Sequence, residues 1–79
     1  MYLCITGFLP GDNGDTSLKY ELKVPSAFQQ PIVSLLGHKS LNAMASVEWL
    51  LTADQVKQIA ALINEPLPLD LDVFIGVEV

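Results

Sequence analysis

The side chains that could take part in catalysis are few in this 79-residue sequence, and they stand apart from one another. His38 is the only histidine, and it lies between Gly37 and Lys39. A histidine acts as a general base on a nucleophile within hydrogen-bonding reach, and no nearby residue supplies one. The hydroxyl residues also lack an activating motif; they include Ser26, Ser34, Ser40 and Thr52. We therefore predict no catalytic residues, and we expect His38 to be a solvated loop histidine.

An acidic loop at residues 12–15, Asp-Asn-Gly-Asp, has the oxygen-bearing side chains of a calcium loop. An EF-hand loop that began at Asp12 would require a bidentate glutamate at its twelfth position, where this chain has Lys23. The same residue types dominate tight turns for backbone reasons. We predict a turn without a metal ion and, for the whole chain, no cofactor. Asp12 and Asp15 stay candidates for partner contact because hairpin tips are commonly exposed.

The C-terminal run from Leu69 to Val79 alternates with a period of two, which is typical of a half-buried strand. The apolar side is predicted to face the core and consists of Leu71, Val73, Ile75, Val77 and Val79. The other side places carboxylates around one aromatic ring. We predict that it binds a partner, with Glu48 joining from the preceding strand; the predicted binding residues are Asp70, Asp72, Phe74, Glu78 and Glu48. The alternative is that these carboxylates only keep the protein soluble and the sheet edge unpaired.

A hairpin is predicted to hold this acidic strand from the N-terminal side. Residues 2–9 are apolar on both parities, which favours a central strand. Turn formers occupy residues 10–17, and residues 18–24 then alternate between apolar and charged side chains. The two strands should therefore pair antiparallel, and the second should have one face in water.

Between this hairpin and the last strand, the sequence predicts helix, strand and helix. Residues 30–37 predict a short helix with Pro31 in its first turn, and an earlier start at Ser26 is the alternative. Residues 46–51 have the β-branched and aromatic content of a strand, with helix as the alternative. Thr52 and Gln55 then form a capping-box pattern that should begin an amphipathic helix.

The resulting order, β-β-α-β-α-β, predicts a single α/β (α+β) domain over residues 1–79. Both helices should pack on one face of a mainly antiparallel four-stranded sheet, in two layers. The predicted core comprises Leu71, Val73, Ile75, Val56, Ile59, Ile63, Leu22 and Tyr20. Trp49 could fill the core or anchor an interface, and the sequence leaves both open.

Composition indicates which partners suit the chain. Nine acidic residues against four basic ones give a formal charge of −5 and a pI near 4.4. This balance argues against direct nucleic-acid binding, whose affinity comes largely from lysine and arginine. A basic protein partner is expected instead.

The single cysteine, Cys4, excludes an intrachain disulfide and favours a reducing, cytoplasmic location. A lone thiol in an apolar strand is expected to be inert packing. The N-terminus lacks the basic region of a signal peptide, and no apolar run has the ~20 residues needed to span a bilayer. We therefore expect no membrane association.

Residues 47–55 and 67–76 together resemble small bacterial immunity-type domains. The resemblance lies in a hydrophobic strand ending in Leu-Thr-x-x-Gln, an amphipathic helix, and a later acidic, aromatic strand. It covers roughly the last third of the chain. The chain departs from the pattern at Ile75 and Gly76, where a second aromatic residue and an acid are more usual.

The resemblance implies an immunity protein of a contact-dependent growth inhibition or similar toxin system. Such a protein is cytoplasmic and neutralises a cognate toxin domain, often a nuclease, by stoichiometric binding without chemistry of its own. The charge agrees in sign, because a nuclease surface that attracts phosphates is commonly basic. The alternative is a small structural or regulatory module that self-associates weakly through a strand edge and has no toxin partner.

Overall fold

The structure is a computed structural model that describes residues 1–11, 17–45 and 47–78. Its strands are β1 (Tyr2–Phe8), β2 (Tyr20–Lys23), β3 (Trp49–Leu50) and β4 (Asp72–Glu78). Its α-helices are α1 (Gln29–Leu35) and α2 (Ala53–Ile63), and two 3-10 helices are η1 (Ser26–Phe28) and η2 (Asn42–Met44). Asp12 and Asp15, two of the predicted partner-binding residues, lie outside the described residues, as does Val79.

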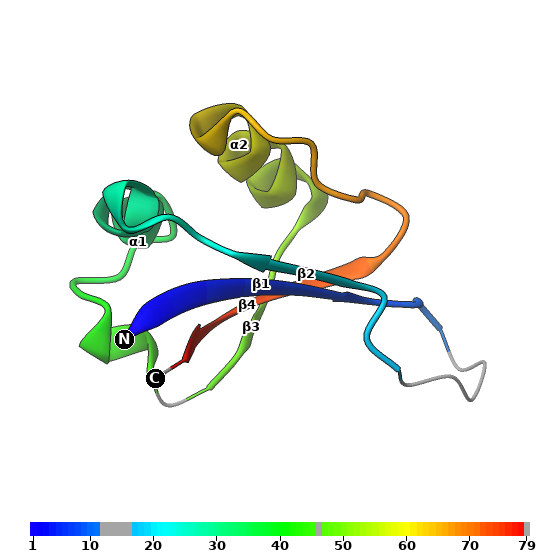
Figure 1. The fold of residues 1–79 in the computed structure, drawn as a ribbon, viewed down its shortest axis with the longest axis horizontal. Helices are drawn as coiled ribbons and strands as arrows, with labels where there is room; N and C mark the ends of the chain where they lie inside the picture. The colour runs from blue at the N-terminus through cyan, green and yellow to red at the C-terminus, as the bar shows by residue number, and fades with distance from the viewer. Residues whose placement is uncertain (12–16, 46, 79) are drawn as a thin grey trace.

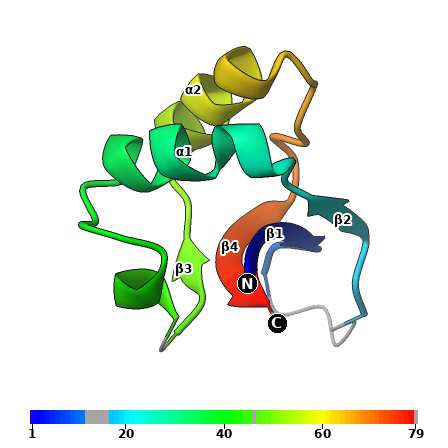
Figure 2. The same cartoon turned by 60° about the vertical axis from the view of Figure 1, so that its left-hand side comes forward.

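The strands form one antiparallel sheet in the order β2-β1-β4-β3. The two longest strands, β1 and β4, pair along their whole lengths at its centre. Both α-helices lie over the same face of this sheet (Figures 1 and 2). The predicted element order, the two layers and the central position of the first strand are thus confirmed.

The core lies between the helices and the sheet. Every residue predicted for it is buried there or packs against it, and Tyr20, Leu22 and Leu71 are the partly buried ones. The core also contains side chains that were not predicted: Leu3, Ile5, Val24, Ile32, Val33, Met44, Leu51 and Leu67. Alternate residues of β1 and of β4 belong to this core cluster, which identifies the side of each strand that faces the helices.

The capping box predicted at the start of α2 is present. Thr52 Oγ1 accepts a hydrogen bond from the Gln55 backbone N–H at 3.1 Å, and Gln55 Oε1 accepts one from the Thr52 N–H at 2.9 Å. These bonds satisfy two amides that the first turn cannot pair internally. The helix ends at Asn64, which adopts a left-handed conformation with φ 55°.

Several element boundaries differ from the predictions, and the strand predicted at residues 18–24 is shorter, Tyr20–Lys23. The first α-helix starts at Gln29 and is preceded by η1, so both predicted starts correspond to helical turns. The third strand is assigned to Trp49–Leu50 rather than residues 46–51, although the Leu51 N–H also donates to the Val73 carbonyl of β4. Residue 46 lies outside the described residues. The last strand begins at Asp72, so Asp70 precedes it instead of lying within it.

Candidate binding site on the open sheet face

The face of the sheet opposite the helices, here called the open sheet face, carries the side chains that alternate with the core residues. Leu3, Ile5 and Ile75 point into the core, so their neighbours in β1 and β4 point away from it. The open sheet face is made of Tyr2, Cys4, Thr6, Phe8, Glu21, Lys23, Leu50, Asp72, Phe74, Gly76 and Glu78. Asp72, Phe74 and Glu78 therefore share one face, as predicted.

Aromatic rings occupy part of the open sheet face. The rings of Phe8 and Phe74 meet edge to face, with centroids 5.9 Å apart and an interplanar angle of 76°. Phe74 is half-buried, because Phe8 covers one side of its ring. Leu50 pairs with Phe74 from β3 and is 60% exposed. A partner would find an apolar strip here, formed by Phe8, Phe74 and Leu50.

Carboxylates lie around this strip. Asp72 is opposite Phe8 and Glu78 is opposite Tyr2 in the pairing of β4 with β1. Glu48 also reaches this face: its Cγ would lie only 2.9 Å from a Cβ placed on Gly76. The missing side chain at Gly76 therefore lets Glu48 lie across β4. Asp70 does not join them in the strand, because β4 begins two residues later.

The carboxylates act together on Cys4, which lies in β1 between them. Burial raises the pKa of the Cys4 thiol above its ordinary value of 9.0. The negative charges of Glu21, Glu78 and Glu48 raise that pKa further. The thiol is therefore protonated at neutral pH and unsuited to nucleophilic chemistry, as predicted for a packing cysteine. The same effect shows that Glu21, which was not predicted, contributes to the negative field.

Few interactions neutralise this charge. Among the described residues, Glu48, Asp72 and Glu78 have no ion-pair partner. Lys23 lies on the same face, but its Nζ is 4.5 Å from the centroid of the Tyr2 ring, so its charge is held at one margin. The buried Thr6 Oγ1, on the same face, has no hydrogen-bond partner within the described ranges. The open sheet face is therefore acidic with an apolar strip.

His38 lies on the helix side, away from the open sheet face. Its ring is 4.6 Å from the Trp49 ring, centroid to centroid, at 54°. The expectation of a solvated loop histidine was wrong in this respect, since His38 is half-buried against Trp49. Trp49 itself packs against the core, and its Nε1–H donates to the Met44 carbonyl at 3.4 Å. The separation of His38 and Trp49 in the sequence did not indicate that their rings would be in contact.

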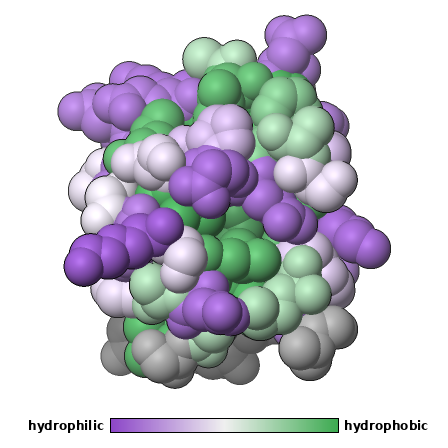
Figure 3. Space-filling view, turned by 90° about the vertical axis from the view of Figure 1, so that its left-hand side faces the viewer, coloured by the Kyte–Doolittle hydropathy of each residue, from purple (hydrophilic) through white to green (hydrophobic). Residues whose placement is uncertain are grey.

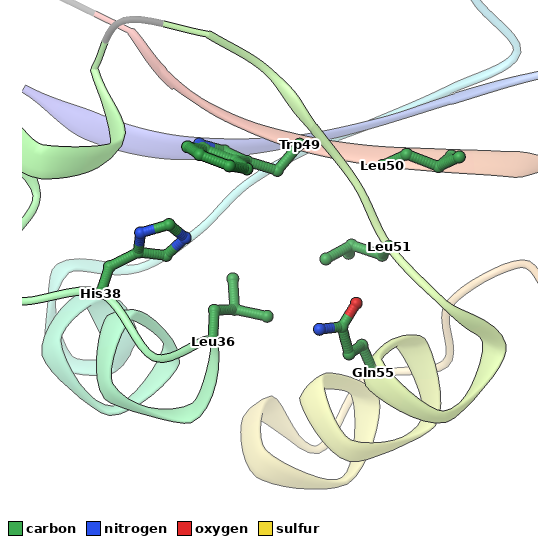
Figure 4. A pocket seen from close by; sticks show the side chains of 6 residues that line it. All are labelled: Leu36, His38, Trp49, Leu50, Leu51 and Gln55. Carbon is green, nitrogen blue, oxygen red and sulfur yellow. The ribbon is translucent and has the colours of Figure 1, made fainter.

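A hollow of about 240 Å³ opens between α1, α2 and β3. Leu36, His38, Trp49, Leu50, Leu51 and Gln55 line it (Figure 4). No carboxylate or hydroxyl is among these residues, so the hollow lacks the partners that would make His38 a general base. Its walls suit an apolar side chain better than a reacting substrate.

Other ligands find little to bind in the described parts of the chain. No group of three His, Cys, Asp or Glu side chains there could hold a metal ion. None of the described helices is long and apolar enough to cross a bilayer. On the side of the molecule that faces left in Figure 1, exposed apolar side chains lie among hydrophilic ones (Figure 3).

Comparison of the chain with protein families, characterised proteins and solved structures gave no match.

Proposed function

We propose that this protein binds a basic protein partner through the open sheet face and performs no chemistry of its own. The observation that carries the proposal is the cluster of Glu21, Glu48, Asp72 and Glu78 around a partly exposed apolar strip. Desolvated apolar groups inside a charged rim are the usual anatomy of a protein interface. An acidic rim would also speed association with a basic partner.

The partner we propose is the cognate domain of an antibacterial toxin, a nuclease. Support comes from the resemblance of residues 47–55 and 67–76 to immunity-type domains and from the net charge of −5. A nuclease presents a basic surface to phosphate groups. An acidic protein that covers this surface would block the substrate without any catalytic residue. Such a protein would act in the cytoplasm, where the toxin would otherwise reach nucleic acid.

Charge reversal on the open sheet face tests this proposal. Asp72→Lys combined with Glu78→Lys should weaken binding to the proposed toxin domain, sought among the products of neighbouring genes, by several kcal/mol, because like charges would then meet. Both side chains are exposed, so the fold should persist. Calorimetry measures the affinity, and survival of cells that express the toxin measures protection.

A matched control changes the same total charge elsewhere. Asp54 and Glu65 are exposed and belong to the α2 region, on the helix side of the sheet. Asp54→Lys combined with Glu65→Lys should leave affinity and protection close to the unmodified protein. Equal loss in both double variants would show that net charge alone matters, and unchanged binding in the first would remove the open sheet face from the interface.

A self-associating module is the second candidate function. The observation in its favour is the exposed apolar pair beside the edge of the sheet, Val47 at 52% and Leu50 at 60%. Such an edge can pair with another copy. Sedimentation across a concentration series separates the two functions, because a toxin-binding protein should stay monomeric without its partner.

A further inference from the structure

The two edges of the sheet differ in how they are protected. In β2, Glu21 and Lys23 lie opposite Thr6 and Cys4 of β1, and both are charged and exposed at this edge of the sheet. Charged side chains at an edge discourage pairing with another strand. At the other edge, β3 presents Leu50, which is apolar and 60% exposed. The β3 edge therefore lacks the protection that the β2 edge has.

Hydrogen bonding within the sheet leaves the Leu50 backbone available. The Leu51 N–H donates to the Val73 carbonyl at 2.8 Å. In an antiparallel ladder the backbone N–H and C=O groups of alternate residues point toward the same neighbouring strand. Those of Trp49 and Leu51 therefore point toward β4. The N–H and C=O of Leu50 consequently point away from the sheet. They form a donor and an acceptor spaced as an added strand requires.

The hollow opens beside this same edge. Trp49 and Leu51 extend from β3 toward the helices, and Leu36, His38 and Gln55 close the other sides (Figure 4). Gln55 uses its Oε1 in the capping box, which leaves its amide N–H groups on the side of the hollow. A side chain that enters from the β3 edge would contact the rings of Trp49 and His38 and the side chains of Leu36 and Leu51.

We propose that the β3 edge binds an extended segment of a protein partner in which basic and large apolar residues alternate. Leu50 would supply the backbone pairing. Side chains of an added strand alternate between the two faces. Those directed to the helix side would enter the apolar hollow, and those directed to the open sheet face would lie next to Glu48.

Charge selects this occupant over a second copy of the chain. The protein carries −5, so pairing of two β3 edges would bring together two copies that carry the same net charge. A basic segment gains attraction where a second copy meets repulsion. The site adjoins the proposed toxin-binding face and shares Leu50 and Glu48 with it. It does not rest on the toxin-binding function, because it uses the backbone of β3 and the hollow and requires only that the partner has such a segment.

A short synthetic peptide with alternating lysine and leucine is the probe. The fluorescence of Trp49, the only tryptophan, reports entry into the hollow. A peptide of the same composition but with its lysines and leucines in separate blocks is the control for charge. A third peptide carries N-methyl groups on the backbone, which remove its hydrogen-bond donors and keep its side chains. Only the first peptide should change the Trp49 emission. The affinity of the N-methylated peptide should be lower than that of the first by at least about ten-fold.

Leu50→Pro tests the same pairing from the protein side. Proline removes an N–H that the fold does not use, as proline at a sheet edge commonly does. It should weaken the alternating peptide about ten-fold, the effect of one backbone hydrogen bond. Lys23→Pro is the matched control, because the Lys23 N–H points outward from β2 in the same way. That variant should bind the peptide as the unmodified protein does.

Three results would overturn the proposal. Equal binding of the alternating peptide and of the peptide with separate lysine and leucine blocks would mean attraction by charge alone. Undiminished binding of the N-methylated peptide would exclude strand pairing even where Leu50→Pro fails to fold. A concentration-dependent dimer of the protein alone that Leu50→Pro abolishes would show that a second copy occupies the edge.

Discussion

Ile75 is the residue whose truncation tests the two-layer arrangement most sharply. It is fully buried in β4, between Ile5 of β1 and Trp49 of β3 in the pairing of the strands. Ile75→Ala removes three carbon atoms, which at about 0.8 kcal/mol each gives about 2.4 kcal/mol of lost burial. The unfilled cavity adds to this, for a total of roughly 2–5 kcal/mol.

This loss is large for so small a domain. At about 0.05–0.15 kcal/mol per residue, a chain of 79 residues has roughly 4–12 kcal/mol of stability in all. Urea unfolding followed by Trp49 fluorescence measures the change, because Trp49 is the cross-strand neighbour of Ile75. The midpoint should fall steeply, and the thermal midpoint should drop by about 10 °C or more.

Ile75→Val is the matched control. It keeps the branched shape and removes one carbon, so it should cost only about 0.5–1.5 kcal/mol. Equal and negligible losses in both variants would refute the assignment of Ile75 to the core face. That result would also exchange the assignments of the core face and the open sheet face, because successive residues of a strand lie on opposite faces of the sheet.

Other predictions concern local features. Thr52→Ala removes the side-chain half of the capping box and should destabilise the protein by about 1 kcal/mol in urea unfolding, while Thr52→Ser should restore most of the loss. Burial raises the pKa of both Cys4 and Tyr20 in the folded state. Their contribution to stability is therefore fully present at pH values below their unfolded-state pKa values, and it is lost as the pH rises through their folded-state pKa values. The urea midpoint should therefore decline above about pH 9, and Cys4→Ala should remove the earlier part of that decline; a midpoint insensitive to alkaline pH would contradict the burial of both groups. His38→Ala should leave toxin protection intact, and loss of protection in a folded variant would reopen catalysis.

Local patterns in the sequence predicted local structure well. The capping box of Thr52 and Gln55 lies within four residues and needs no distant contact, so its presence could be read directly. The alternation in the last strand likewise placed Val73 and Ile75 in the core and Phe74 opposite them. Both depend only on the geometry of one element.

Contacts between distant segments could not be read in this way. Phe74 is half-buried because the register of β1 and β4 places Phe8 against it, and no local pattern fixes that register. Glu48 reaches the open sheet face because Gly76 leaves room on the neighbouring strand. The stacking of His38 on Trp49 depends on how the connection after α1 returns to the sheet. Each requires tertiary packing to be known.

The most direct test of the open sheet face is a map of which side chains the toxin domain touches. Nuclear magnetic resonance cross-saturation from the bound toxin domain to this protein identifies protons at the interface. Binding through the open sheet face predicts strong transfer to Phe8 and Phe74 and none to Leu62, an exposed residue of α2 on the helix side. Transfer to Leu62 with none to the two phenylalanines would contradict it and place the partner over the helices.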